Sequence, residues 1–261
     1  MRGLRGSTRR VVNPAMATLQ FAATSGGVRV EMRIVCDFDG TISRSDTTDL
    51  VLERLARPAW RALEADWLAN RITAAECMRR QIALIDATQD ALDDVLDAVE
   101  LDPGFLDFVA WCEARDLPLS IVSDGVDDFI LRILERHGLQ RLPVIANRLT
   151  HDVGAWGLEQ PWARQGCAAG SGVCKCRAAT LTGRTQGAST LVYVGDGRSD
   201  FCIAGRADVL FAKDALADYA VSRGRPFHPF ETFHDVTAAL ARLVAAGLPL
   251  TGASAARAAG L

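Results

Sequence analysis

Lysine is nearly absent from this sequence. Only Lys175 and Lys213 are lysines, whereas the other 27 of the 29 basic residues are arginines. The 32 acidic residues outnumber these cations and give a formal net charge of −3. Proteins that bind DNA, RNA or an acidic membrane surface need clustered positive charge. We therefore expect neither nucleic acid nor membrane as a partner, and a lysine in such a chain is a candidate for a specific role.

The sequence also lacks long apolar runs. No stretch reaches the roughly 18 to 20 uninterrupted apolar residues that a membrane-spanning helix requires. The seven cysteines are an odd number, and several lie within apolar patterns. Cysteines scattered in this way favour the reducing cytoplasm over a disulfide framework. We expect a cytoplasmic protein whose 261 residues form one large domain, or one domain carrying a smaller insertion. The sequence leaves the oligomeric state open, with a homodimer as one option.

The two ends of the chain differ in composition from the rest. Residues 1–31 contain five arginines and no acidic residue before Glu31, and they lack the apolar segment of a targeting sequence. The segment MRIVCDFDG, which starts at Met32, begins directly on an expected strand. We expect 1–31 to be a disordered extension or a start codon assigned too early, and the small, polar residues 247–261 to be a disordered tail.

Short apolar runs alternate with helical patterns along most of the chain. The expected strands are 33–37, 118–123, 143–146, 190–195 and 208–212. The expected helices are 104–115, 126–138, 174–182, 199–206 and 231–244. This alternation predicts an α/β fold with a parallel sheet covered on both faces, and such a sheet binds its ligand at the carboxyl ends of its strands.

The interval 46–100 does not alternate and contains only amphipathic helical segments. These lie near 46–56, 58–70, 73–86 and 89–99, with Thr73 and Thr88 as expected N-caps. We therefore expect a core domain formed by 32–45 and 101–246, and a helical cap domain, 46–100, that acts as a lid.

Polar residues follow the expected strands at positions where their chemistry converges. Asp37 and Asp39 end the first strand in the segment IVCDFDGTIS, and a buried pair of like charges needs a cation or a proton. Ser123 ends the second strand, Lys175 opens a helix, and the loop GDGRSD (195–200) ends a later strand. Because carboxyl ends of parallel strands lie side by side, these groups should face one crevice.

This set of side chains suits phosphate transfer. Asp37, the backbone carbonyl of Asp39, and Asp196 offer the hard oxygen ligands that Mg²⁺ prefers. A phosphate held beside the metal by Ser123, Lys175 and backbone N–H groups could be attacked by Asp37 to form an aspartyl phosphate. Asp39 could then protonate the leaving alkoxide and deprotonate the hydrolytic water.

The motifs D-x-D-G-T, a hydroxyl residue, a lysine and G-D-G-x-S-D resemble those of the haloacid dehalogenase (HAD) superfamily of phosphatases, over about residues 33–245. The resemblance implies a Rossmann-like parallel sheet with an inserted C1-type helical-bundle cap, as in the phosphoserine-phosphatase-like branch. By motif it implies Asp37 as nucleophile and Asp39 as general acid and base and metal contact. It implies Ser123 and Lys175 as phosphate ligands, with Asp124 and Gly125 as further phosphate-binding positions and with Gly40 and Thr41 shaping the phosphate loop. It implies Asp196 as metal ligand and Asp200 as indirect or water-mediated metal contact.

Within that branch the chain is similar to the MtnX-like phosphatases of methionine salvage. The similarity depends on CDFDGTIS, on PWARQGCAAGSGVCKC (161–176) and on LFAKD (210–214). It implies a small phosphorylated metabolite as partner, with 2-hydroxy-3-keto-5-methylthiopentenyl-1-phosphate as the first choice. Phosphoserine, or a phospho-alcohol of the phosphocholine or phosphoethanolamine type, is the alternative. A non-enzymatic receiver domain also combines acidic residues with Ser or Thr and Lys, but the motif order favours the hydrolase.

Several residues keep more than one interpretation. Asp124 stands where phosphoserine phosphatases usually have Gly, and a carboxylate there suits a phosphate site only if it points away or toward the metal or lid.

The cap residues Asp46, Arg80 and Gln81 are candidates for substrate specificity. Gln81 aligns with an arginine that phosphoserine phosphatases use for the substrate carboxylate, which weighs against phosphoserine. The thiols of Cys167, Cys174 and Cys176 hold a soft metal, form a disulfide, or pack as free thiols, which is the default. Lys213 is expected at the start of a helix, on the surface.

Overall fold

The computed structural model describes residues 32–152, 154–182 and 190–246. The expected extension, 1–31, and the expected tail, 247–261, lie outside the described residues. Among the residues that are described, no helix has both the length and the apolar character needed to cross a membrane.

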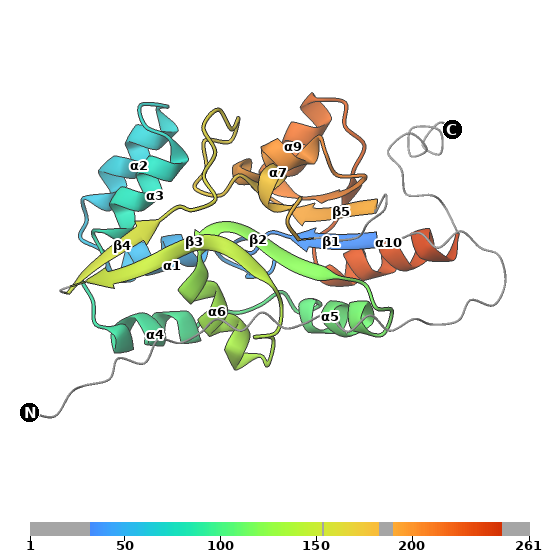
Figure 1. Cartoon of the computed structure of the whole chain (residues 1–261), viewed down its shortest axis with the longest axis horizontal. Helices are drawn as coiled ribbons and strands as arrows, with labels where there is room; N and C mark the ends of the chain where they lie inside the picture. Colours follow the sequence, from blue (N-terminus) through green and yellow to red (C-terminus); the bar gives the residue numbers. More distant parts are fainter. Residues whose placement is uncertain (1–31, 153, 183–189, 247–261) are drawn as a thin grey trace, which may run out of the picture.

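A seven-stranded sheet forms the centre of the molecule (Figure 1), which confirms the predicted α/β class. Its strand order is β4-β3-β2-β1-β5-β6-β7. The strands are β1 (Met32–Cys36), β2 (Leu119–Val126), β3 (Val144–Asp152), β4 (Ala155–Glu159), β5 (Thr190–Gly195), β6 (Val209–Ala212) and β7 (His228–Pro229). Neighbouring strands are parallel except β4, which pairs antiparallel with β3. The sequence patterns predicted neither β4 nor the two-residue β7.

The central strands consist of apolar residues because both faces of the sheet are covered. β5 is buried along its whole length, and β1 nearly so. The ladder pairs Cys36 with Ile121 on one side and with Val194 on the other. The residues that follow β1, β2 and β5 therefore leave the sheet next to one another, as the parallel arrangement predicted.

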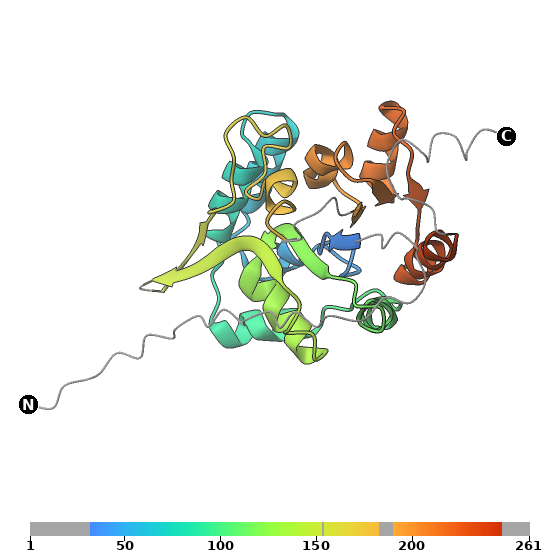
Figure 2. The same cartoon turned by 45° about the vertical axis from the view of Figure 1, so that its right-hand side comes forward.

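Helices cover the two faces of the sheet (Figures 1 and 2). One face carries α5 (Phe105–Glu113), α6 (Asp127–Arg136) and α10 (Phe233–Ala245), which pack on Ile34 and Cys36 of β1. The other carries α7 (Lys175–Ala178), a 3-10 turn η1 (Arg198–Asp200), α8 (Phe201–Ala204) and α9 (Asp214–Ser222), which pack with Val35. The predicted helix 174–182 is shortened to α7. No range was predicted for α9, although Lys213 was expected at the start of a helix.

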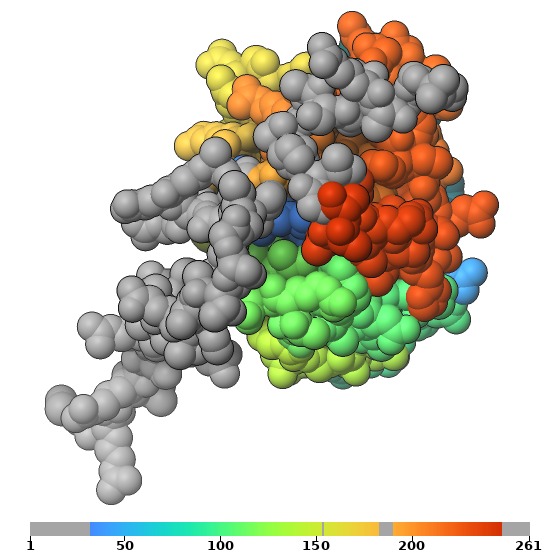
Figure 3. Space-filling view, turned by 90° about the vertical axis from the view of Figure 1, so that its right-hand side faces the viewer, coloured from blue at the N-terminus to red at the C-terminus, as the bar shows by residue number. Residues whose placement is uncertain are grey.

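A buried carboxylate joins α5 to α10 at their N-terminal ends. Asp102, with 6% of its surface exposed, accepts hydrogen bonds from the backbone N–H of Gly104 and of Phe233, each at 2.9 Å. Phe105 and Phe108 pack against Phe233 beside it, with ring centroids 4.9 and 5.0 Å apart. Figure 3 shows the two helices, green and red, next to each other on this face of the molecule.

The interval 46–100 forms four helices, as predicted. They are α1 (Thr47–Leu55), α2 (Trp60–Leu68), α3 (Ala74–Ile82) and α4 (Gln89–Asp97). Thr73 and Thr88 accept hydrogen bonds from the backbone N–H groups of Glu76 and Ala91, so both predicted N-caps are confirmed. The helices do not share one environment: α2 packs on α3 above the sheet, whereas α4 lies below it against α6.

Two features attach the cap helices to the core. Arg132 of α6 pairs with Asp93 and Asp97 of α4, at 3.1 and 2.8 Å. The second feature is a set of hydrogen bonds to the β3–β4 hairpin and the loop that follows it. There the Ala75 N–H donates to the Gly170 carbonyl at 2.9 Å, and the Gln160 amide donates to the Ala75 carbonyl at 3.0 Å. Figure 2 shows this yellow loop running beside α2 and α3.

Candidate active site

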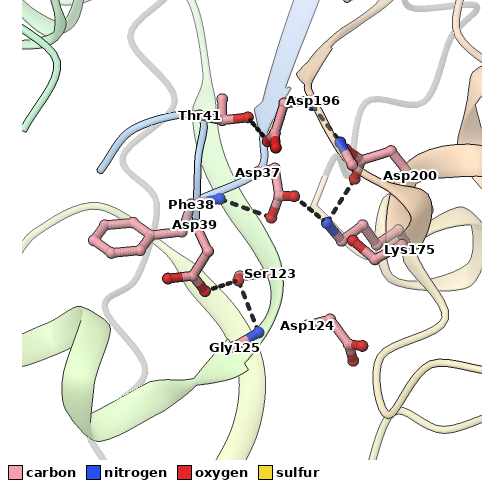
Figure 4. A network of polar contacts seen from close by, with 12 residues as sticks. Asp37, Phe38, Asp39, Thr41, Ser123, Asp124, Gly125, Lys175, Asp196 and Asp200 are labelled. Atoms are coloured by element: carbon pink, nitrogen blue, oxygen red, sulfur yellow. Dashed lines mark hydrogen bonds and ion pairs between the residues drawn. The ribbon is translucent and has the colours of Figure 1, made fainter. Parts of the chain in front are cut away.

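Asp37 leaves the end of β1 and turns its side chain into a buried polar cluster (Figure 4). Its backbone N–H donates to the Val194 carbonyl at 2.9 Å, which continues the β1–β5 ladder by one residue. One carboxylate oxygen, Oδ1, accepts a hydrogen bond from the Phe38 N–H at 2.7 Å. The other, Oδ2, lies 2.6 Å from Lys175 Nζ. Asp37 is thus fixed at the carboxyl edge of the sheet, where the sequence predicted it.

Lys175 is completely buried, with 0% of its surface exposed. A buried ammonium group is strongly unfavourable unless opposite charges surround it. Here Nζ lies 2.6 Å from an oxygen of Asp37 and 2.6 Å from an oxygen of Asp200. Burial by itself lowers the pKa of Lys175, but Asp200 and Asp37 together raise that pKa above its usual value. The lysine therefore remains charged, and it binds two carboxylates, one directly after β1 and one in the turn η1 that follows β5.

Asp200 organises the loop that follows β5. Its oxygen Oδ1 accepts hydrogen bonds from Lys175 and from the Tyr193 hydroxyl, at 2.6 and 2.5 Å. Its oxygen Oδ2 accepts from the backbone N–H groups of Asp196 and Gly197, at 3.0 and 2.9 Å. Sequence reasoning found Asp200 but missed Tyr193, for which the only signal is that a tyrosine within a buried strand needs a partner for its hydroxyl.

Asp196 and the D-x-D-G-T loop approach each other closely. The Thr41 hydroxyl donates to Asp196 Oδ1 at 2.5 Å. Gly40 has a φ of +71°, and a Cβ on it would lie 2.6 Å from an Asp196 carboxylate oxygen, so no larger residue fits there. Burial, and next the charge of Asp200, raise the pKa of Asp196 to about 6. Gly40 and Thr41 thus shape this loop around Asp196.

Three carboxylates of this cluster form a candidate cation site. Asp37, Asp196 and Asp200 each offer an oxygen, and these three oxygens all lie within 4.8 Å of one another. Burial, and next the charge of Asp200, raise the pKa of Asp37 well above its usual value, although Lys175 opposes the shift. Three carboxylates around one ammonium group leave a negative excess, and an oxygen-only donor set of this kind suits Mg²⁺. The residues present therefore fit the predicted ion.

Asp39 points away from Asp37, toward α1 and β2. Its oxygen Oδ1 accepts hydrogen bonds from the backbone N–H of Thr47, at 2.9 Å, and from the Thr47 hydroxyl. Its oxygen Oδ2 lies 3.4 Å from the Ser123 hydroxyl. Burial in the cleft, and next the charge of Asp46, raise the pKa of Asp39 to about 7, against the opposing effect of the Thr47 hydrogen bonds. A carboxyl group with such a pKa can both give and take a proton near neutral pH.

The last residues of β2, where its pairing with β3 shifts register, separate into two groups. Ser123 is buried and accepts the Gly125 N–H at 2.9 Å, and a Cβ on Gly125 would lie 2.3 Å from Asp39 Oδ2. Asp124 turns the other way, as Figure 4 shows, and accepts the Val173 N–H at 2.8 Å. Burial raises the pKa of Asp124 to about 6, and that hydrogen bond opposes the shift. The unusual Asp124 therefore holds the loop before α7 and does not face Asp37.

A cavity of about 670 Å³ opens over this cluster. On the core side it is lined by Asp37, Asp39, Ser123, Asp196 and Arg198. On the cap side it is lined by residues of α1 to α3 and their connections, and by 167–171 of the loop after β4. The guanidinium of Arg198 lies 5.5 Å from the centre of the Trp67 ring, so core and cap meet across the cavity.

The three predicted cap residues have different surroundings. Gln81 is buried with 4% of its surface exposed, lines the cavity and donates to Glu64 Oε2 at 2.9 Å. Asp46 lines the cavity and caps α1, where it accepts the Asp49 N–H at 2.9 Å. Arg80 lies on the outer face of α3 and pairs with Glu76 at 3.4 Å. The helical period that turns Gln81 inward turns Arg80 outward, so Arg80 is not brought to the cavity.

The two lysines also differ. Lys213 precedes α9 as its N-cap residue, as predicted for a residue at a helix start, and its ammonium lies 5.1 Å from the centre of the Phe230 ring. It forms no salt bridge within the described residues.

Sequence reasoning missed Asn147, a buried residue of β3 whose amide donates to the backbone carbonyls of Asp124 and Gly125. Asn147 therefore supports the irregular end of β2 that carries Ser123.

Comparisons with known proteins agree with this geometry. The haloacid dehalogenase-like hydrolase family matches residues 34–205, more than half of the chain. A 2-hydroxy-3-keto-5-methylthiopentenyl-1-phosphate phosphatase of Geobacillus kaustophilus is 33% identical over 217 residues, which cover 82% of this chain and 97% of that protein. A phosphatase of the same name from Microcystis aeruginosa is 27% identical over 208 residues, covering 78% of this chain and 94% of that protein.

Solved structures show the same fold. A phosphoserine phosphatase, determined as an analogue of its phospho-aspartyl intermediate, has a TM-score of 0.59 and 17% identity, covering 78% of this chain and 95% of that one. At this identity the similarity concerns the fold alone. The motif that begins at Asp37 predicted this relationship, and the matches confirm it. The chain belongs to the haloacid dehalogenase-like hydrolase family.

Proposed function

We propose that this protein is a Mg²⁺-dependent phosphomonoester hydrolase that acts on a small phosphorylated metabolite through a phospho-aspartyl intermediate on Asp37. The observation that carries the proposal is the position of Asp37, whose carboxylate is buried, bound to Lys175 at 2.6 Å, and grouped with Asp196 and Asp200. The family membership and the phosphatase names of the relatives support the same reaction class.

In the first step a carboxylate oxygen of Asp37 attacks phosphorus. The new O–P bond forms as the bond from phosphorus to the ester oxygen breaks, and that oxygen leaves with the electron pair. Asp39, whose pKa is raised to about 7, gives the leaving oxygen its proton. In the second step Asp39 takes a proton from water, which attacks phosphorus and releases inorganic phosphate and the Asp37 carboxylate.

Other residues hold the charges in place. Lys175 would lie beside the attacked phosphate and offset its negative charge, and the buried hydroxyl of Ser123 would donate to a phosphate oxygen. Asp37, Asp196 and the backbone carbonyl of Asp39 would hold Mg²⁺, with Asp200 contributing directly or through water. The ion, when bound, supplies positive charge that offsets the repulsion between carboxylates and phosphate.

For the substrate we propose 2-hydroxy-3-keto-5-methylthiopentenyl-1-phosphate, after the names of the relatives. Trp67, Ile72 and Met78 offer apolar surface in the cavity to which a methylthio group could bind. Gln81 donates to Glu64 instead of presenting a positive charge, which weighs against a substrate carboxylate such as that of phosphoserine.

A phospho-alcohol with a cationic head is the second candidate. Asp46, Asp49 and Glu64 line the cap side of the cavity, and three carboxyl groups there would attract an ammonium group. We also propose that residues 46–100 act as the cap domain, with α2 and α3 as the part that faces the substrate. A panel of phosphorylated metabolites assayed with Mg²⁺ separates the two substrate classes, because only the second predicts a preference for phosphocholine or phosphoethanolamine.

The central experiment uses p-nitrophenyl phosphate and three variants, one of which is a control. Asp37→Asn removes the nucleophile and should abolish turnover, while Asp107→Asn, on the exposed face of α5, should retain it. Asp39→Asn should release p-nitrophenolate in a burst of about one equivalent, because this leaving group needs no proton whereas hydrolysis of the phosphoenzyme needs the base. Normal turnover by a folded Asp37→Asn variant would refute the nucleophile assignment.

A further inference from the structure

Four cysteines converge beside the active site from three separate segments of the chain. Cys167 lies in the loop after β4, Cys174 and Cys176 flank Lys175 at the start of α7, and Cys202 lies in α8. The sulfur atoms of Cys167, Cys174 and Cys202 all lie within 4.8 Å of one another. The Cys176 sulfur lies 3.4 Å from that of Cys174. Sequence analysis saw three of these thiols and missed Cys202, because it is distant in sequence.

The spacing of the sulfur atoms suits a metal ion. A tetrahedral zinc ion with metal–sulfur bonds of about 2.3 Å places its four sulfur ligands about 3.8 Å from one another. The observed separations, 3.4 Å for one pair and at most 4.8 Å within the group of three, bracket that value. Cys176 lies outside the group of three, so a rotation of its side chain would have to bring its sulfur within reach of the ion. Cys174 and Cys176 are buried, whereas Cys167 and Cys202 are half-buried, which gives an ion a path to the site.

Positive charges lie near two of these thiols. Arg164 acts on Cys174, and Arg206 acts on Cys176. A zinc ion with four thiolates carries a net charge of about −2, which these guanidinium groups stabilise.

Apolar packing is the simpler explanation for buried cysteines, because a free thiol behaves as a small apolar group. That explanation fits Cys36, Cys77 and Cys112, which are buried in separate elements. Apolar packing alone does not explain why sulfur atoms from three segments meet, or why two of these cysteines are half-buried. A disulfide pair would use only two of the four thiols and is disfavoured in a reducing compartment.

We propose that Cys167, Cys174, Cys176 and Cys202 form a structural four-thiolate site for zinc. Binding releases a proton from each thiol that is protonated and joins the loop after β4 to α7 and α8. These segments carry active-site groups: Lys175 lies between two of the ligands, Asp200 lies just before a third, and residues 167–171 line the cavity. The ion would therefore fix the Lys175–Asp200 pair and one wall of the cavity without touching the substrate.

The first test is the metal content of the full-length protein. After expression with added zinc and removal of loosely bound ions, elemental analysis should find about one zinc per chain. Cys202→Ser and Cys167→Ser should lose most of that zinc. Cys112→Ala, which removes a buried thiol from α5, should retain it, and so should Asp196→Asn, which alters the carboxylate cluster. Retention by Asp196→Asn distinguishes this site from the Mg²⁺ site of the proposed function.

A second measurement keeps the proposal testable if a cysteine variant does not fold. Chelator-treated wild-type protein reloaded with Co²⁺ should show the intense thiolate-to-metal charge-transfer absorption and the visible bands of tetrahedral cobalt. Thiol counting should find four more reactive cysteines after chelation than before it. A wild-type protein that binds no zinc, disulfides among these cysteines in the protein isolated under non-oxidising conditions, or full zinc content in a folded Cys202→Ser variant would each overturn the proposal.

Discussion

Replacement of Lys175 by methionine tests whether the buried ion pairs hold the active site together. The substitution keeps the length and apolar stem of the side chain and removes only its charge. At an effective dielectric constant of about 20, each 2.6 Å contact with Asp37 and Asp200 corresponds to a gross attraction of about 6 kcal/mol. Burial of the ammonium group also costs free energy, and the substitution removes that cost, which offsets much of the lost attraction. Removal of one partner from a buried pair typically costs about 3–5 kcal/mol, and we expect a loss in that range.

The pH dependence gives the sharper result. Burial, and next the charge of Asp200, already hold the folded-state pKa of Asp37 above its usual value, and loss of Lys175 raises it further. A carboxyl group with a raised folded-state pKa is destabilising when ionised, so the penalty is greatest at high pH and is relieved as protonation proceeds. The difference in unfolding free energy between wild type and Lys175→Met should therefore be larger at about pH 8 than at about pH 5.5.

Urea-induced unfolding, followed by circular dichroism at both pH values, measures these differences. Lys213→Met is the matched control, because it makes the same change at the only other lysine and should alter stability by less than about 1 kcal/mol. The double variant Lys175→Met with Asp200→Asn should recover part of the loss. A Lys175→Met protein within about 1 kcal/mol of wild type at pH 8, or a loss that does not change with pH, would refute the reasoning.

Three further predictions concern other buried groups. Asp102→Ala leaves two buried backbone N–H groups without an acceptor and should lower the unfolding free energy by about 2–4 kcal/mol in urea titrations; a loss below about 0.5 kcal/mol would contradict this. The pKa of Asp124 is raised to about 6, so its ionised form lowers the unfolding free energy above that pH. Asp124→Asn removes this charge and still accepts the Val173 N–H. The variant should therefore stabilise the protein by up to about 3 kcal/mol at pH 8 but not at pH 4. Gln81→Ala should change the ratio of kcat/KM between metabolite phosphates, whereas Arg80→Ala should leave it unchanged, since only Gln81 lines the cavity.

The parts of the fold that the sequence predicted are those with a strong local pattern. Strands such as β5 are buried on both faces and therefore appear as uninterrupted apolar runs. The second half of β3 was missed because RLTHD is largely polar; it pairs with β4 as a hairpin that is only partly buried. A helix start was expected at Lys213, but the range of α9 was missed because only Leu216 and Ala220 of this helix are buried, which gives a weak periodic signal.

The candidate site was predictable to the extent that single residues carry its chemistry. Asp37, Ser123, Lys175 and the GDGRSD segment each lie at or near the end of a strand or open a helix, and the parallel sheet brings such positions together. Their supporting partners are different. Tyr193, Asn147 and Cys202 lie outside the recognised motifs, and no local pattern shows which groups their side chains contact. Their positions depend on how the elements pack, which only the structure describes.

The hydrogen bonds between the Ala75 backbone and the loop after β4 affect which changes of the cavity lining the fold can accept during evolution. The Ala75 N–H and the Gly170 carbonyl are main-chain groups, and the Ala75 carbonyl accepts from Gln160 in the same region. Exchange of neighbouring cap side chains leaves these groups in place. Substitutions on α2 and α3 can therefore alter ligand preference during evolution without breaking the attachment of the cap to this loop. A proline at position 75 would break that attachment, because proline has no backbone N–H to donate to the Gly170 carbonyl.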